Sequence, residues 1–264
     1  MNKLYTLFFN KLRILKWKIV PINVNKVLKI EQKKEKDICY LKKILERLDQ
    51  NIPRIYIDCG ANLGLYSSAI IDTIGDSSKL ISFEPRIDVY IILKERFKSY
   101  SNFTGEILAV SNNNKTTYLC LNSSFAKGSL SFTNRDHGFK SQPVYSVRLD
   151  SYIQNIKHNN NIFFIKIDIE GHELNVLKGS EIILKNHKPI ILCEIEQRHH
   201  GSVSSITTIF KYMKNLGYCA YYYSSNKESL VSVDNIFSNQ DINSDDYIFN
   251  YWFINQTKLK FLPV

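Results

Sequence analysis

The sequence of 264 residues lacks an apolar run of the length that crosses a membrane, which takes roughly 18 residues in succession. Its first stretch, MNKLYTLFFNKLRILKWKIV, has an apolar patch too short and too interrupted for a secretory signal, and no small-residue cleavage site follows. The five cysteines are scattered, without a CxxC pair or a metal-ligand spacing. We therefore expect a cytoplasmic protein in a reducing compartment.

Positive charge is concentrated at the N-terminus. Residues 1–50 contain 13 Lys and Arg against 5 Asp and Glu, while residues 51–264 contain 22 against 20. The nearly neutral main part lacks the basic stripe of a nucleic-acid-binding surface, so we expect no DNA partner and keep an RNA substrate only as an alternative. Residues 1–20 have the pattern of a basic amphipathic helix, which is more typical of a helical extension that packs its apolar side on the main domain. The alternative is peripheral contact with the inner face of the membrane.

Short apolar runs alternate with helical patterns from residue 51 onward, which is typical of βαβ units and a parallel sheet. The chain therefore divides into a basic, helical N-terminal extension (1–50) and an α/β domain (51–264). Loop-like and half-exposed strand patterns interrupt the domain at 112–149 and predict a β-rich insertion near the substrate. The expected strands are 55–58, 80–84, 105–110, 162–168, 189–196, 217–223 and 247–255, and the expected helices are 62–75, 88–100, 172–184 and 203–217.

An acidic residue ends each of four expected strands. In an open parallel sheet, ligands bind at the carboxyl ends of the strands, near the point where the strand order reverses. One or two such acids are common as caps of the following helix, but four predict a shared ligand crevice. The four residues are Asp58, Glu84, Asp168 and Glu194.

The loop after the first strand, DCGANLG, indicates the kind of ligand. It lacks the G-x-G-x-x-G that cradles a pyrophosphate, which disfavours a nicotinamide-dependent oxidoreductase. Asp58 precedes the loop and suits a ligand with a cationic end, such as S-adenosylmethionine. Glu84, at the end of the next strand, is placed to accept hydrogen bonds from ribose hydroxyls.

The segments IYIDCGANLGLYS, ISFEP, ILAVS and FFIKIDIEGHELNVLKGS…KPIILCEIE resemble the FkbM family of S-adenosylmethionine-dependent methyltransferases over about residues 54–222. The resemblance implies a class I methyltransferase fold, a mostly parallel twisted sheet with helices on both faces. It also implies methylation of hydroxyl groups in sugars, polysaccharide units or polyketides. The cofactor-binding residues that it implies are Asp58, Gly60, Asn62, Gly64 and Glu84, with Ala109, Val110 and Ser111 near the adenine.

The block KIDIEGHE then has a chemical interpretation. By the resemblance, Asp168 and Glu170 face the methyl-transfer site, and Glu194 is a further catalytic candidate at the same edge. Crowded carboxylates raise the pKa of at least one member, which makes it a better base for the acceptor hydroxyl. Alternatively the acids hold Mg²⁺, which polarises that hydroxyl.

Other polar residues near this block have simpler interpretations. Lys166 is expected to pair with a neighbouring acid, and His172 to lie at the surface or the edge of the core. His199 and His200 have no metal-spaced partner in the sequence, so we predict no metal ligand among them.

The sequence thus predicts a cytoplasmic O-methyltransferase of polysaccharide biosynthesis acting on a sugar, glycan or related small molecule. A catalytically silent module that only binds S-adenosylmethionine remains the main alternative.

Overall fold

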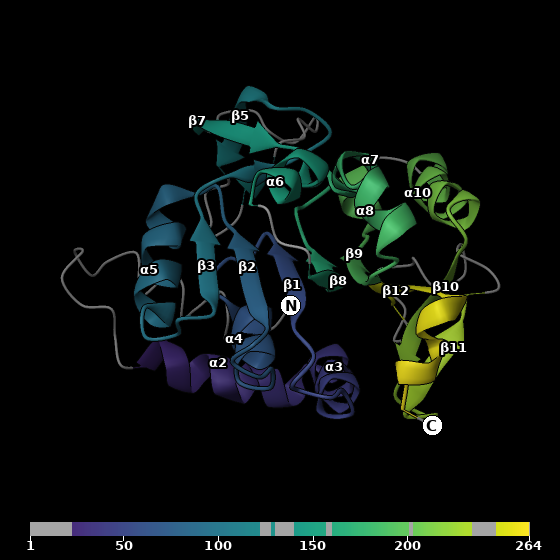
Figure 1. Ribbon diagram of the computed structural model, residues 1–264. Helices are drawn as coiled ribbons and strands as arrows, with labels where there is room; N and C mark the ends of the chain where they lie inside the picture. The colour runs from purple at the N-terminus through teal and green to yellow at the C-terminus, as the bar shows by residue number, and fades with distance from the viewer. Residues whose placement is uncertain are drawn as a thin grey trace.

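The computed structural model describes residues 23–121, 128–129, 140–156, 160–200, 203–233 and 247–263 (Figure 1). The helix expected over residues 1–20, and with it the alternative of membrane contact, lies outside these ranges. Within them, no helix has both the length and the apolar character needed to cross a membrane.

A main sheet of eight strands forms the centre of the described structure. The strands β3, β2, β1, β8 and β9 are mutually parallel, whereas β12 runs antiparallel to both β9 and β10, and β11 is antiparallel to β10. In spatial order they are β11 (Ser229–Ser232), β10 (Tyr218–Ser224), β12 (Asn250–Asn255), β9 (Ile190–Glu194), β8 (Asn161–Ile167), β1 (Arg54–Cys59), β2 (Lys79–Phe83) and β3 (Phe103–Glu106).

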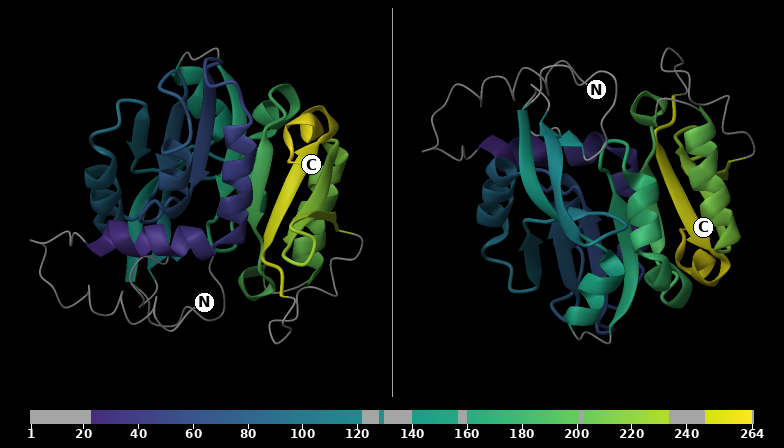
Figure 2. Two further views of the ribbon diagram at one scale, coloured as in Figure 1. Left: turned by 90° about the horizontal axis from the view of Figure 1, so that it is seen from below. Right: turned by 90° about the horizontal axis from the view of Figure 1, so that it is seen from above.

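Helices cover both faces of this sheet (Figures 1 and 2). One face carries α6 (Leu149–Asn155), α7 (Glu173–Gly179), α8 (Glu181–Asn186) and α10 (Val203–Asn215). The other carries α3 (Lys36–Glu46), α4 (Leu65–Ile71) and α5 (Ile87–Phe97), with α2 (Asn23–Lys34) packed on α4. Two short elements, α9 (Gln197–His200) and the 3-10 helix η1 (Gln256–Phe261), follow β9 and β12.

Alternation along the strands explains why both faces are covered. In β8, Ile165 and Ile167 pack against α6–α10, while Phe164 packs against α3–α5. A strand that is apolar on both sides is stable only when helices bury both sides. The structure therefore confirms the predicted fold class, including the mostly parallel sheet.

The predicted β-rich insertion is also confirmed, as a separate small sheet. Its spatial order is β4 (Ala109–Val110), β7 (Lys140–Val147), β5 (Lys115–Leu121) and β6 (Gly128–Ser129). The division of the chain at residue 50 stays a prediction. The described part of that N-terminal segment forms α2 and α3, and the apolar side of α3 lies in the core of the domain.

Two expected elements are wrong in their extent. The strand expected over 105–110 is split, since β3 belongs to the main sheet and β4 pairs with β7 in the small one. Ile107, between them, is 40% exposed, so the apolar run does not stay in one sheet. The helix expected over 172–184 is broken at Ser180, whose φ and ψ are −118° and 14°. Gly179, just before the break, packs against the backbone of Ser111, where an added Cβ would lie 2.0 Å from the carbonyl oxygen.

We predict that Ile44→Ala lowers the free energy of unfolding by about 2–5 kcal/mol, because Ile44 of α3 is fully buried in the core and its removal leaves a cavity. Lys43→Ala, an exposed position of the same helix, is the control and should change it by less than about 0.5 kcal/mol. Urea denaturation of the two variants measures both values. Equal effects would mean that α3 is not part of the core.

Candidate active site

Four carboxylates lie at the carboxyl ends of four neighbouring strands. From β9 through β8 and β1 to β2 they are Glu194, Asp168, Asp58 and Glu84. The chain runs outward from β1 through β2 to β3 and later returns to β8 on the other side of β1, so the strand order reverses between β1 and β8. This reversal is where an open α/β sheet binds its ligands. The structure thus brings the four predicted acids to one edge.

The loop after β1 depends on left-handed backbone conformations. Gly60, Asn62 and Gly64 have φ values of 78°, 52° and 80°. A Cβ on Gly60 would lie 1.9 Å from the backbone oxygen of Asp168, so only glycine allows β1 and β8 to continue into loops that touch. Gly64 precedes α4, where a Cβ would come within 2.5 Å of the Phe97 ring.

Asp58 is enclosed beneath this loop. Its carboxyl group is 1% exposed and accepts a hydrogen bond of 2.6 Å from the hydroxyl of Ser67 in α4. Burial raises the pKa of Asp58 to about 6, although the Ser67 hydrogen bond and the charge of Lys166 act in the opposite direction. Asp58 is therefore a buried group beneath the loop and has almost no exposed surface.

Glu84 is held at the end of β2 by backbone donors. One carboxyl oxygen accepts from the amide of Asn62 at 2.9 Å, and the other from the amide of Arg86 at 2.8 Å. Burial raises the pKa of Glu84 to about 7 despite these two bonds. The carboxyl group is fixed in position and ties the loop of Asn62 to β2.

Lys166 is a buried cation between the acids. Its ammonium group lies 3.9 Å from Asp168, donates to the side-chain oxygen of Asn250 at 3.4 Å, and sits 4.8 Å from the centre of the Tyr66 ring. Burial by itself lowers the pKa of Lys166, but Asp168 and Glu194 outweigh it and the pKa is raised. Lys166 is therefore charged, and it pairs with a neighbouring acid as the sequence predicts.

Asp168 and Glu194 are hydrogen-bonded to each other. Burial raises the pKa of both carboxyl groups. The pKa of Glu194 rises well above its ordinary value, chiefly through burial and further through the like charge of Asp168 beside it. About a third of the Asp168 side chain is exposed, which makes it accessible from solvent at this edge of the sheet. The pair can therefore hold one proton between two oxygens while Lys166 balances the remaining charge.

The IEGHE turn brings each of its two acids next to a histidine. Glu170 and Gly171 have φ values of 55° and 102°, and the Glu170 carboxylate lies 2.7 Å from Nε2 of His199 in α9. Glu173 lies 2.9 Å from Nε2 of His200. The three acids of the block thus have three different neighbours.

The residues implied near the adenine are largely buried in the protein. Ala109 and Val110 pack in apolar clusters, and both residues pair with β7 in the small sheet. The Ser111 hydroxyl lies 2.9 Å from Nε2 of His172, whose pKa is lowered by burial. His172 therefore joins the strand end at Ser111 to the start of α7.

The sequence did not reveal a series of hydrogen-bonded polar side chains that connects Lys166 to residues near the beginning and the end of the described chain. Asp37 of α3 accepts from the indole Nε1 of Trp252 at 2.6 Å and from the Asn250 amide at 3.1 Å, and Asn250 in turn accepts from Lys166. Burial raises the pKa of Asp37. In the sequence, the position of Asp37 directly before the apolar run ICYL indicates that its side chain could be buried.

Comparison with protein-family models matches residues 58–219 to the methyltransferase FkbM domain. The search of curated proteins found no match.

Solved structures give further similarities. An FkbM methyltransferase from Methylobacillus flagellatus is 16% identical with a TM-score of 0.49, covering 76% of this chain and 43% of that one. An S-adenosylmethionine-dependent O-methyltransferase from Thermotoga maritima is 12% identical with a TM-score of 0.42, covering 83% and 64%. Fibrillarin from Aeropyrum pernix, in complex with natively bound S-adenosylmethionine, is 10% identical with a TM-score of 0.44, covering 78% and 68%. This chain thus spans less than half the length of the FkbM structure.

We predict that Glu84 makes the free energy of unfolding fall as the pH rises. Its pKa is about 7 in the folded protein against an ordinary 4.5, so its contribution is fully present below about pH 4.5 and is lost as the pH rises through about 7. The loss amounts to about 3 kcal/mol. Urea denaturation between pH 4.5 and 8 should show a smaller fall in Glu84→Gln than in the wild type. The exposed control Glu95→Gln should follow the wild type, and an unchanged slope in Glu84→Gln would contradict the prediction.

Proposed function

Because the chain belongs to the FkbM methyltransferase family, we propose that it is an S-adenosylmethionine-dependent O-methyltransferase acting on a hydroxyl of a sugar, glycan or related small molecule. The observation that carries the proposal is the accessible carboxyl group of Asp168, set between Lys166 and Glu194 at the reversal of the strand order. The family supports methyl transfer, and this geometry supports a hydroxyl acceptor, since a hydroxyl needs a base.

The residues of the β1 and β2 ends fit S-adenosylmethionine. Glu84 presents a carboxyl group held by two backbone amides, which suits the two hydroxyls of a ribose. Asp58 places a negative charge beneath the glycine loop, which favours a ligand with a positively charged end. When bound, S-adenosylmethionine supplies an electrophilic methyl group on a sulfonium.

Asp168 is then the group that accepts the proton of the acceptor hydroxyl. Its raised pKa makes it a stronger base than an ordinary aspartate. Lys166 stabilises the carboxylate before the proton arrives, and Glu194 keeps its orientation by their shared hydrogen bond. A base of this kind contributes about 10²–10⁴ to the rate.

We expect Glu84→Ala to weaken S-adenosylmethionine binding by about 1–3 kcal/mol, the scale of lost hydrogen bonds to a charged group. Calorimetry measures the change, with Glu95→Ala, an exposed glutamate of α5, as the control that keeps wild-type affinity. Tight binding of NAD without any response to S-adenosylmethionine would overturn the proposed function.

A screen of nucleotide sugars and glycan fragments for methyl acceptance comes before the catalytic test. With an acceptor found, Asp168→Asn should lower the rate of methyl transfer by about 10²-fold or more, because the amide cannot take a proton. Cofactor affinity should change little, and the exposed control Asp76→Asn should keep full activity. Full activity of Asp168→Asn would show that Asp168 is not the base.

A further inference from the structure

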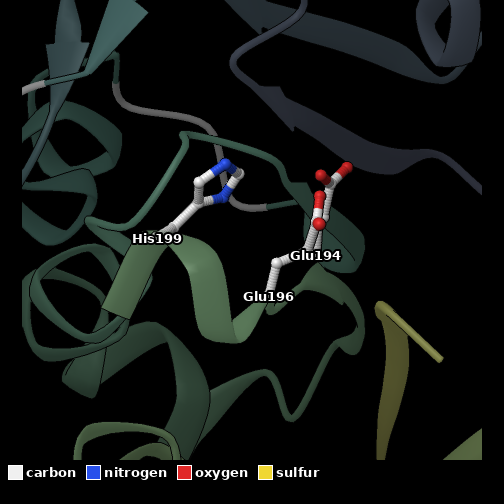
Figure 3. Close-up of side chains that lie close together, drawn as sticks. All are labelled: Glu194, Glu196 and His199. Carbon is white, nitrogen blue, oxygen red and sulfur yellow. The ribbon is translucent and has the colours of Figure 1, made fainter. Parts of the chain in front are cut away.

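A second cluster lies beside Asp168, at the end of β9 and the start of α9. Glu194, Glu196 and His199 each bring one potential metal-ligand atom to within 4.8 Å of those of the other two. Figure 3 shows the imidazole of His199 and the two carboxylates on either side of a common space. The spacing E-x-E-x-x-H, unnoticed in the sequence, becomes a cluster because the chain turns sharply between β9 and α9.

Groups outside the cluster hold two of its members in place. Glu170 lies 2.7 Å from Nε2 of His199 and takes up that nitrogen, which leaves Nδ1 as the ligand atom. A histidine that binds a metal usually donates its other ring N–H to such a carboxylate. The hydroxyl of Tyr247 donates to Glu196 at 2.9 Å, and Glu196 is only 5% exposed.

Carboxyl groups, the ligands that hard cations prefer, are concentrated around this cluster. Four carboxyl groups lie in this region, those of Asp168, Glu170, Glu194 and Glu196. The buried ammonium group of Lys166 lies 3.9 Å from a carboxyl oxygen of Asp168. A divalent cation between Glu194 and Glu196 would replace the proton through which Glu194 is hydrogen-bonded in its absence.

We propose that Glu194, Glu196 and His199 form a divalent-cation site suited to Mn²⁺. Two carboxylates and one imidazole match the ligand preferences of Mn²⁺ better than the all-oxygen shell of Mg²⁺. Three protein ligands leave further coordination positions open.

These open positions give the site its role, and that role rests on the proposed function. Glu194 belongs both to the cation site and to the pair with Asp168, so an acceptor hydroxyl bound to the cation would lie beside the base. A Glu194 that binds the cation has released its proton to solvent, which leaves Asp168 as the free carboxylate that takes the proton of the acceptor. A cation also lowers the pKa of an oxygen that it binds. The acceptor that fits best is a vicinal diol, as in a sugar, because its second oxygen can occupy a second open position.

The test uses the full chain, freed of metal with EDTA and titrated with Mn²⁺. Loss of the free Mn²⁺ signal in electron paramagnetic resonance counts bound ions without any acceptor or cofactor. We expect one ion per chain, and at least 10-fold weaker binding in Glu196→Gln and in His199→Ala. His187→Gln, a histidine at the end of α8, is the matched control and should bind as the wild type does.

Thermal denaturation with and without Mn²⁺ provides the second measurement. The wild type should be stabilised by the ion, and the near-isosteric Glu196→Gln should remain folded but gain no stability from it. Absence of Mn²⁺ binding by the wild type at millimolar concentration, or equal binding by both ligand variants, would overturn the site.

An assay of methyl transfer tests the role of the cation in holding the acceptor separately from the existence of the cation site. Bound Mn²⁺ together with methyl transfer that is indifferent to EDTA would overturn the role in holding the acceptor. Bound Mn²⁺ without methyl transfer to any acceptor would sustain the site while refuting the proposed function.

Discussion

The buried ammonium group of Lys166 holds together parts of the chain that are far apart in sequence. It pairs with Asp168 on its own strand end, donates to Asn250 on β12 and lies over the ring of Tyr66 in α4. A cation removed from water is stable only when carboxylates and polar atoms replace its hydration, and loss of one partner of such a pair costs about 3–5 kcal/mol. The positions of β8, β12 and α4 at this edge of the sheet therefore depend on one another.

The charge of Lys166 also reduces the repulsion within a crowded group of acids. Asp168 and Glu194 share a hydrogen bond beside it, while the left-handed turn at Glu170 and Gly171 directs the next acid toward His199. Repulsion between like charges is thus reduced by separation and by pairing rather than by exposure to water. Sites of function commonly combine groups that would destabilise an ordinary core in this way.

Local patterns in the sequence predicted the main sheet, because buried parallel strands form continuous apolar runs. They also predicted the row of acids, because the carboxyl ends of parallel strands lie at one edge of the sheet. The split between β3 and β4 could not be predicted, since Leu108 and Ala109 look like a continuation of the strand. The break before Ser180 arises from contact between Gly179 and Ser111, which no local pattern encodes. Asp37 and His199 acquire their partners only through tertiary packing.

The polar chain from Asp37 through Asn250 to Lys166 has a consequence for synthesis of the protein on the ribosome. Asp37 and Trp252 are 215 residues apart, and Asn250 belongs to the last strand of the main sheet. Until β12 has emerged and inserted between β9 and β10, Asp37 and Lys166 lack these partners, and both flanking strands expose an unpaired edge. A nascent chain thus passes through a partly folded stage that is prone to aggregation and is a substrate for chaperones. The contacts of Asn250 with Lys166 and Asp37 therefore form only after β12 is in place.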